Sequence, residues 1–241
     1  AFSSEIKAFA ELPGFKLQPS QPGLQQYLEF GYVFDQDQTF LEGVNKLAPG
    51  HRMEVRAGEK EKITSYFLAP APDPKDLRSE KERVDELRDV LTQVASEHLI
   101  ADVPVGLLLS GGLDSSVIAA LAAKQGPLLT ISMGFSDSII DERPHAKQVS
   151  DYIGSRHLEI LITPEQVMAE VESGAWVFDD LFADWGTMTT RLMYRRCREH
   201  GIKVVLVGEG ADELFGGYDI FNVPESMNTW QRFRLYQRYA G

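Results

Sequence analysis

The hydrophobic pattern changes once along the chain, at a proline-rich stretch over residues 69–76. Before this stretch, apolar and polar residues alternate over residues 51–67, which predicts a β-hairpin with Gly58 in its turn. After it, Val84 and Leu87 open a helical spacing of apolar positions. The predicted parts are a small β-rich part over residues 1–67, an extended linker over 68–78, and a larger part over 79–241.

Within the larger part, strands and helices are predicted to alternate. Ser79 and Glu82 form a capping-box pattern that predicts the start of its first helix. The short apolar runs predict strands at 105–109, 128–133, 157–162 and 203–208. Helices are expected at 115–126, ended by Gly126, at 141–154, at 164–178 with Thr163 as cap and Pro164 as first residue, and at 189–201.

This alternation favours parallel strands joined by right-handed crossovers, and hence an α/β fold with a doubly wound parallel sheet. Such sheets bind ligands at the carboxyl ends of their strands. Two glycine-rich loops, "SGGLDSS" at 110–116 and "GEGADELFGG" at 208–217, follow predicted strands. Both loops are therefore expected at the same edge of the sheet.

Composition narrows the classes of partner. The chain has 43% hydrophobic and 25% charged residues, as globular proteins do, and a formal net charge of -12. That charge disfavours nucleic acid as a main partner. We interpret the densest basic cluster as a solvated helix face; it consists of Arg191, Arg195, Arg196 and Arg198. No apolar run is long enough to span a bilayer, so a membrane partner is not expected.

The single cysteine bears on the cellular compartment, and the first residues bear on whether the chain is a fragment or has been processed. Cys197 alone excludes an intrachain disulfide and suits a reducing compartment, so a cytoplasmic location is expected. Its helical context predicts an ordinary thiol. The chain starts at Ala1, without an initiator methionine or a signal pattern, which favours a fragment or a processed chain.

The first glycine loop has the chemistry of an anion site. A helix that starts near Asp114 or Ser115 leaves unpaired N–H groups and partial positive charge at its N-terminus. Gly111 and Gly112 let the backbone approach a ligand, and the hydroxyls of Ser110, Ser115 and Ser116 add donors. The loop therefore predicts a phosphate cradle, and Asp114 fits it if Mg²⁺ lies between the carboxylate and the phosphate. The loop lacks the G-K-[ST] ending of a Walker A motif.

The second loop offers carboxylates. It resembles a dinucleotide fingerprint at Gly208 and Gly210, but its sixth position is Glu213, so that motif fails. Glu209, Asp212 and Glu213 beside an anion site imply a metal or a proton-transfer role. We expect Asp212 to face Asp114 and bind metal. Glu213 alone is expected to favour the helix N-terminus.

Together these loops resemble a known family. "SGGLDSS" resembles the pyrophosphate loop of the N-type ATP pyrophosphatases, whose fold is adenine-nucleotide hydrolase-like. "GEGADELFGGY" and "ISMGFSDSIIDE" (131–142) resemble the synthetase domain of glutamine-hydrolysing asparagine synthetases. "LQQYLEFGYVFDQDQTFLEGVNKLAPGH" and "ITSYF" resemble the end of that family's N-terminal-nucleophile glutaminase domain.

The resemblance implies ATP-dependent amidation through an acyl-adenylate, with ATP and Mg²⁺ as cofactors, aspartate or another small carboxylate as substrate, and ammonia from glutamine. A homodimer is a possible assembly. The resemblance implies that pyrophosphate and its Mg²⁺ are held by Ser110, Gly111, Gly112, Asp114 and Ser115, with Asp212 also on the metal. It implies that the adenosine site is lined by Leu109, Met133, Val207 and Gly208. Glu209 is implied to transfer protons of the amino acid or of ammonia.

Two departures leave alternatives open. The family's glutaminase nucleophile is an N-terminal cysteine, where this sequence has Ala1, and a catalytic lysine that the family places further on has no counterpart before Gly241. The alternatives are an amidotransferase for another carboxylate, such as a sugar acid, and a catalytically incomplete fragment that assembles with a partner. "GEGADELFGGY" favours the amidating branch over lactam-forming relatives.

Overall fold

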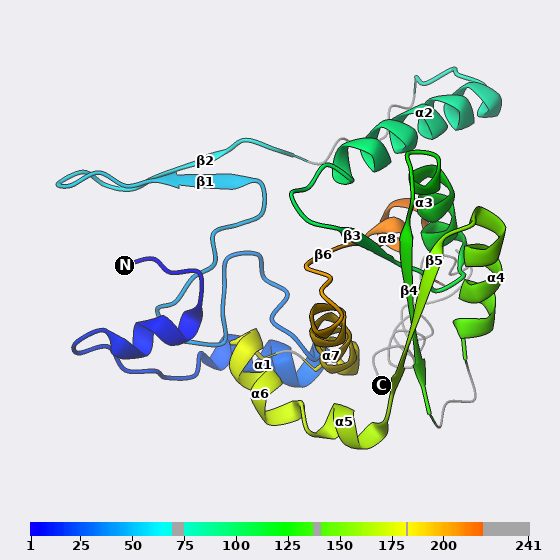
Figure 1. Cartoon of the computed structure of the whole chain (residues 1–241). Coiled ribbons are helices and arrows are strands. Elements are labelled where there is room, and N and C mark those ends of the chain that lie inside the picture. The colour runs from blue at the N-terminus through cyan, green and yellow to red at the C-terminus, as the bar shows by residue number, and fades with distance from the viewer. Residues whose placement is uncertain (69–74, 137–140, 182, 219–241) are drawn as a thin grey trace, which may run out of the picture. The chain divides into compact units, whose positions relative to one another are not determined.

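The computed structural model describes residues 1–68, 75–136, 141–181 and 183–218. Most of the proline-rich stretch and part of the "ISMGFSDSIIDE" segment lie outside these ranges. The described residues divide into two compact units (Figure 1). Among the described residues, one unit consists of Ala1–Asp76 and Glu172–Trp185, and the other consists of Leu77–Val171 and residues 186–218.

The first unit is built from short elements. They are a 3₁₀ helix over Ile6–Glu11, α1 over Gln21–Phe30, β1 over His51–Glu54, β2 over Lys62–Ser65, and nearly all of α6, which spans Val171–Phe178. The strands β1 and β2 pair antiparallel, and Gly58 adopts a φ of +78° between them, so the predicted hairpin is confirmed. The carboxylate of Asp179 accepts the backbone N–H of Lys7 at 3.0 Å, which ties the two segments of this unit together.

The second unit contains a four-stranded parallel sheet. Its strand order is β5-β4-β3-β6, with β5 at Arg156–Ile162, β4 at Leu129–Phe135, β3 at Val105–Leu108 and β6 at Val204–Leu206. All three pairings in the sheet are parallel, as the alternating pattern predicts. In this order, the loops that follow β3 and β6 come from neighbouring strands.

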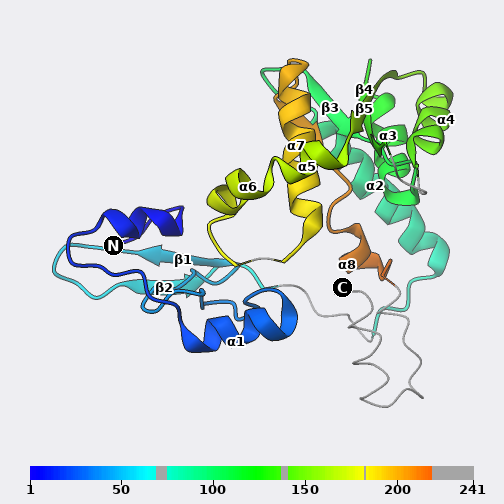
Figure 2. The ribbon, with the colours of Figure 1, turned by 90° about the horizontal axis from the view of Figure 1, so that it is seen from below.

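Helices cover both faces of this sheet, and each face has its own core. The helices of the second unit include α2 over Glu80–His98, α3 over Leu113–Ala123, α4 over Arg143–Ile153 and α7 over Trp185–Glu199. Leu107 packs with Ala119 of α3 and Ala146 of α4, whereas Ile131 packs with Leu192 of α7. Figures 1 and 2 show α3 and α4 on one side of the strands and α7 on the other. The doubly wound fold is confirmed.

The helix expected over 164–178 is interrupted. Thr163 does cap a helix with Pro164 as its first residue, but this helix, α5, ends at Met168 and α6 begins at Val171. Glu170, in the break, is only 2% exposed and forms ion pairs with Arg191 and Arg195 of α7. Arg195 keeps 49% of its side chain exposed, as a solvated helix face would, and Arg191 keeps 27%. The interpretation of the cluster as a solvated face therefore misses only that both residues also neutralise a buried carboxylate.

Other boundaries shift by a few residues. The capping box of Ser79 and Glu82 is present at the start of α2. The helix α3 begins at Leu113, slightly earlier than expected, and it ends at Ala123, before Gly126. Among the helices in the described part of the chain, none combines the length and the apolar character that crossing a bilayer would require.

Candidate functional site

The first glycine loop joins β3 to α3 in a turn held by its own serines. The hydroxyls of Ser110 and Ser115 lie 3.0 Å apart, and the Gly112 amide donates to Ser110 Oγ at 3.2 Å. Gly112 is the N-cap of α3, and no side chain caps this helix. The first N–H groups of an eleven-residue helix are therefore free of a side-chain acceptor, which suits an anion.

The middle of this loop rests against α4. Gly111 adopts a φ of +85°, and a Cβ atom at this position would lie 2.6 Å from the backbone nitrogen of Ala146. Only glycine fits so close an approach in a left-handed conformation. Gly111 therefore shapes the loop from behind.

The second loop lies beside the first. It connects β6 to α8, which spans Ala211–Phe215, and Gly210 adopts a φ of +86° at the N-cap of α8. A Cβ atom at Gly208 would lie 3.6 Å from Asp114 Cβ, so the two loops are in contact. This contact follows from the pairing of β3 with β6.

The two loops open into one cavity of about 360 Å³. Gly111 and Ser116 are absent from its lining, and the other residues predicted to bind ligand line it, namely Leu109, Ser110, Gly112, Asp114, Ser115, Met133, Val207, Gly208, Glu209 and Asp212. Ser116 lines no part of it; its hydroxyl is buried and has no hydrogen-bond partner among the described residues. The expected donor role of Ser116 is therefore not supported.

Other lining residues were not foreseen from the sequence. They are Leu108, Ile131, Glu142, Thr190, Met193, Gly210 and Tyr218, together with Tyr194. Thr190, Met193 and Tyr194 share one face of α7 because they are spaced three and four residues apart. This spacing, in the helix that precedes β6, is the sequence signal from which these cavity residues could have been predicted.

Negative charge dominates the electrostatics at the second loop. Burial raises the pKa of the Tyr194 phenol, and the Glu209 carboxylate raises it further. The pKa of Tyr218 is raised first by its hydrogen bond to Glu213, at 3.2 Å. Both phenols therefore stay protonated at neutral pH and can donate a hydrogen bond, whereas Glu213 is engaged with Tyr218.

The carboxylates of Asp114 and Asp212 both line the cavity. Among the residues that the structure describes, no group of three or more His, Cys, Asp or Glu side chains is placed to hold a metal. Mg²⁺ commonly takes one or two carboxylates and completes its shell with water and phosphate oxygens. The two aspartates beside an anion loop fit that pattern.

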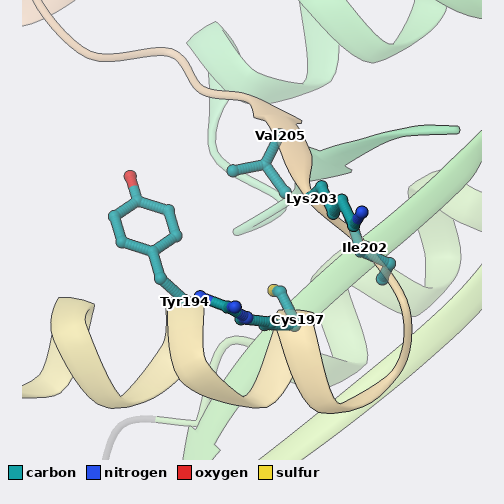
Figure 3. Close-up of a pocket in the computed structure, with 6 residues that line it drawn as sticks. Tyr194, Cys197, Ile202, Lys203 and Val205 are labelled. Carbon is teal, nitrogen blue, oxygen red and sulfur yellow. The ribbon is translucent and has the colours of Figure 1, made fainter. Parts of the chain in front are cut away.

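A second cavity, of about 530 Å³, lies between the end of α7 and β6 (Figure 3). Its lining consists of Tyr194, Cys197, Arg198, Ile202, Lys203 and Val205. It contains neither glycine loop and no carboxylate, and burial raises the pKa of the Cys197 thiol. This cavity is larger, but the chemistry of the loops points to the other one.

Comparison with known families agrees with this site. Residues 86–240 match the family model described as asparagine synthase. The chain belongs to the asparagine synthase family. Residues 1–67 match the model of a glutamine amidotransferase domain. Both matches confirm the family resemblance read from the motifs.

Curated relatives carry related names. The chain is 35% identical over 236 residues to a putative glutamine-hydrolysing asparagine synthetase of Mycobacterium tuberculosis, covering 95% of this chain and 36% of the relative. It is 34% identical to asparagine synthetase 1 of Bacillus subtilis, covering 96% and 36%. It is also 35% identical to amidase chry2 of Gibberella zeae, covering 80% and 32%. The chain thus spans roughly a third of the length of these relatives.

Proposed function

We propose that this chain carries the nucleotide site of an enzyme that amidates a carboxylate through an acyl-adenylate, with aspartate as the favoured substrate. The observation that carries this proposal is the single cavity into which both glycine loops open, with Asp114, Glu209 and Asp212 in its wall. Membership of the asparagine synthase family supports the same chemistry.

The proposed reaction has two steps. In the first, a carboxylate oxygen attacks the α-phosphorus of ATP, and the bond to pyrophosphate breaks. In the second, ammonia attacks the acyl carbon, and AMP leaves with the electron pair of the C–O bond. The products are the amide, AMP and pyrophosphate, and the proton that ammonia loses needs an acceptor.

The residues divide between these steps. Ser110, Ser115 and the N–H groups at the start of α3 would bind pyrophosphate. Asp114 and Asp212 would hold Mg²⁺, which neutralises phosphate charge when bound. Glu209 would stand at the amino-acid end and accept the ammonia proton.

The adenosine half of ATP would lie on the apolar wall of the cavity. Leu109 and Met133 line this wall, and Val207 and Gly208 come from the neighbouring loop. A nucleotide with its phosphates over Gly112 would then span the ends of β3, β4 and β6, where parallel sheets bind ligands.

Isotope exchange tests the proposal. With the intact protein, labelled pyrophosphate should return to ATP only when the correct carboxylate is present, because adenylation is reversible. Aspartate-dependent exchange supports asparagine synthesis. Exchange with a sugar acid alone supports the alternative substrate class, to which the amidase-named relative gives loose support. If none of the carboxylates tested supports exchange, the result would contradict the acyl-adenylate route.

A further inference from the structure

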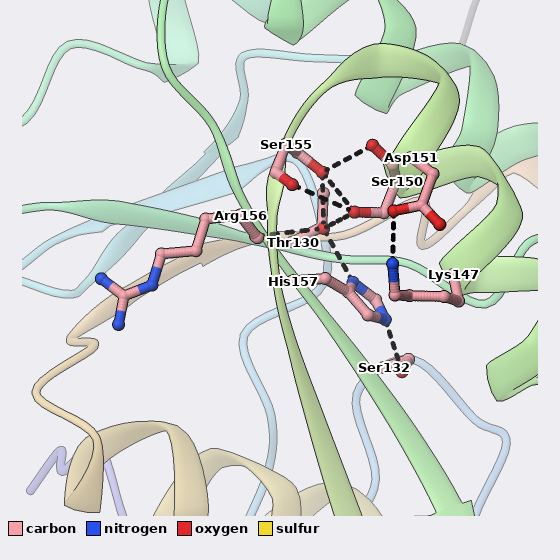
Figure 4. Close-up of polar contacts among 8 residues, drawn as sticks. All are labelled: Thr130, Ser132, Lys147, Ser150, Asp151, Ser155, Arg156 and His157. Carbon is pink, nitrogen blue, oxygen red and sulfur yellow. Dashed lines mark hydrogen bonds and ion pairs between the residues drawn. The ribbon is translucent and has the colours of Figure 1, made fainter.

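A polar cluster joins the C-terminal end of α4 to the strands β4 and β5 (Figure 4). Thr130 and Ser132 of β4 and Ser150 of α4 are buried, with 0%, 2% and 0% of their surface exposed. His157 of β5 stands opposite Thr130 in the strand register and is partly buried. Hydroxyl groups and an imidazole ring thus occupy a place in the core where apolar side chains are usual.

The imidazole ring of His157 bridges two of these hydroxyls. Its Nδ1 lies 2.9 Å from Thr130 Oγ1, and its Nε2 lies 3.0 Å from Ser132 Oγ. A neutral ring satisfies both contacts with one donor and one acceptor. A protonated ring would require both hydroxyls to accept, and it would place a charge among groups withdrawn from water.

The same cluster holds the last turn of α4. Thr130 Oγ1 lies 2.8 Å from Ser155 Oγ, which in turn lies 2.8 Å from Ser150 Oγ. The Ser155 amide also donates to the Ser150 carbonyl at 3.0 Å. Through these contacts, the orientation of His157 determines how Thr130 engages the end of α4.

The turn of α4 that precedes Ser150 supports the anion loop. Ala146 is fully buried, and its backbone nitrogen and the Cβ of His145 would each lie 2.6 Å from a Cβ atom at Gly111. Ala146 and Ser150 lie four residues apart within α4, so these two contacts occupy successive turns of one regular element. A displacement of the anchored end would therefore reach the loop.

We infer that His157 is a proton-sensitive positioning residue: its neutral ring anchors α4, α4 keeps Gly111 and its loop in the anion-binding conformation, and proton uptake by His157 loosens both. Only the last consequence, weaker binding of ATP phosphates, rests on the proposed function. The coupling between the cluster and the loop stands on the contacts alone.

The direction of the pH effect follows from the surroundings of His157. Burial lowers its pKa; Glu159 of β5 raises it, Lys147 of α4 lowers it, and Asp151 of α4 raises it. The part of β4 that faces the ring contributes only hydroxyls.

Because the folded pKa lies below the ordinary value of about 6.5, the opened state binds the proton more tightly. The anchoring is intact above that pH and is lost as the pH falls below it.

Hydrogen exchange tests the coupling without any ligand. Protection factors of amides in α4 and in the 110–115 loop should be measured for wild type and His157→Gln from about pH 7.5 to about 5.5. In wild type, both regions should lose protection below about pH 6.5, by up to about tenfold per pH unit. In His157→Gln, which cannot take up the proton, protection should be flat. His98→Gln, a change at an exposed residue of α2, should behave as wild type.

Two outcomes would overturn the inference. One is that the protection factors of His157→Gln depend on pH in the same way as those of wild type. The other is that amides of α4 lose protection at low pH while amides of the 110–115 loop keep theirs. If His157→Gln does not fold, the ring of His157 should be titrated by NMR in wild type, where an ordinary midpoint near about 6.5 would refute the anchoring.

Calorimetric titration with ATP and Mg²⁺ tests whether proton uptake by His157 also weakens ligand binding at the proposed site. Lowering the pH should raise the dissociation constant for ATP in both proteins or in wild type alone. The increase in wild type should exceed the increase in His157→Gln by roughly fivefold or more, the lower range for coupling between sites. Parallel changes in both proteins contradict the inference. No binding at the higher pH in either protein contradicts the proposed function, and the exchange data then still decide whether His157 positions the loop.

Discussion

Gly217 lies directly against the carboxylate of Asp212. A Cβ atom at Gly217 would overlap Asp212 Oδ1 and would lie 2.9 Å from its Cγ. The Gly217 amide also donates to the Asp212 carbonyl at 3.0 Å. The position of this carboxylate in the cavity therefore depends on a residue that has no side chain.

Gly217→Ala should weaken Mg²⁺-dependent ATP binding by about 10-fold to 100-fold, the usual effect of disturbing a group that orients a metal ligand. Calorimetric titration with ATP, in Mg²⁺ and in chelator, measures this. Gly208→Ala is the matched comparison. Its Cβ would make ordinary contacts, the nearest at 3.5 Å from the Ser115 nitrogen, and because Gly208 is proposed to line the adenosine site, any loss of binding should be the same in Mg²⁺ and in chelator. Equal losses with and without Mg²⁺ would show that Gly217 does not act through a metal ligand.

Asp114→Ala and Glu209→Ala should separate the two proposed steps in the intact protein. Loss of Asp114 should abolish pyrophosphate exchange, because this residue is proposed to hold the metal and the leaving group. Loss of Glu209 should spare much of the exchange and reduce amide formation by roughly 10²-fold or more, the lower range for a proton-transfer group. Undiminished exchange in Asp114→Ala would remove "SGGLDSS" as the pyrophosphate loop.

Glu170 and its two arginines should show an asymmetric effect on stability. The double change Arg191→Ala with Arg195→Ala removes two positive charges beside a buried carboxylate and should lower the free energy of unfolding by about 3 kcal/mol or more. Arg196→Ala removes an exposed pair with Glu199 at 2.9 Å and should cost less than about 1 kcal/mol. Denaturant unfolding of both variants measures the difference, and similar midpoints would contradict the role assigned to Glu170.

Cys197 should react slowly with thiol reagents in the folded protein. It is 2% exposed, and burial raises the pKa of its thiol, so little thiolate is present at neutral pH. Reaction with a colorimetric disulfide reagent should become fast only after denaturation. Rapid reaction of the native protein at neutral pH would show that the cavity beside α7 opens to solvent.

The elements and the neighbouring glycine loops could be predicted because local rules determine them. A strand that breaks into "SGG" before a helix places its loop at a sheet edge, and alternation of strands and helices makes the sheet parallel. The contact between Gly208 and Asp114 then follows from the order of two strands. Ser79 and Thr163 were recognisable as caps for the same local reason.

What the sequence did not reveal depends on contacts between distant residues. The break at Glu170 forms because this carboxylate turns inward to arginines about twenty positions later, which helical periodicity cannot register. Gly111 packs on α4, and this contact is set by tertiary structure that the motif cannot show; the expected role of Gly111 in pyrophosphate binding stays a prediction. Tyr194 lies in the wall of the cavity because α7 crosses the sheet beside β6.

The bond between Lys7 and Asp179 has a consequence for biosynthesis. During translation Lys7 emerges from the ribosome well before Asp179, which follows it by 172 positions. The first unit therefore stays incomplete while most of the parallel sheet is made, and its early segment must wait for a partner that emerges after β5. Translation order thus places the completion of the first unit late, within the period in which the second unit is itself being synthesised.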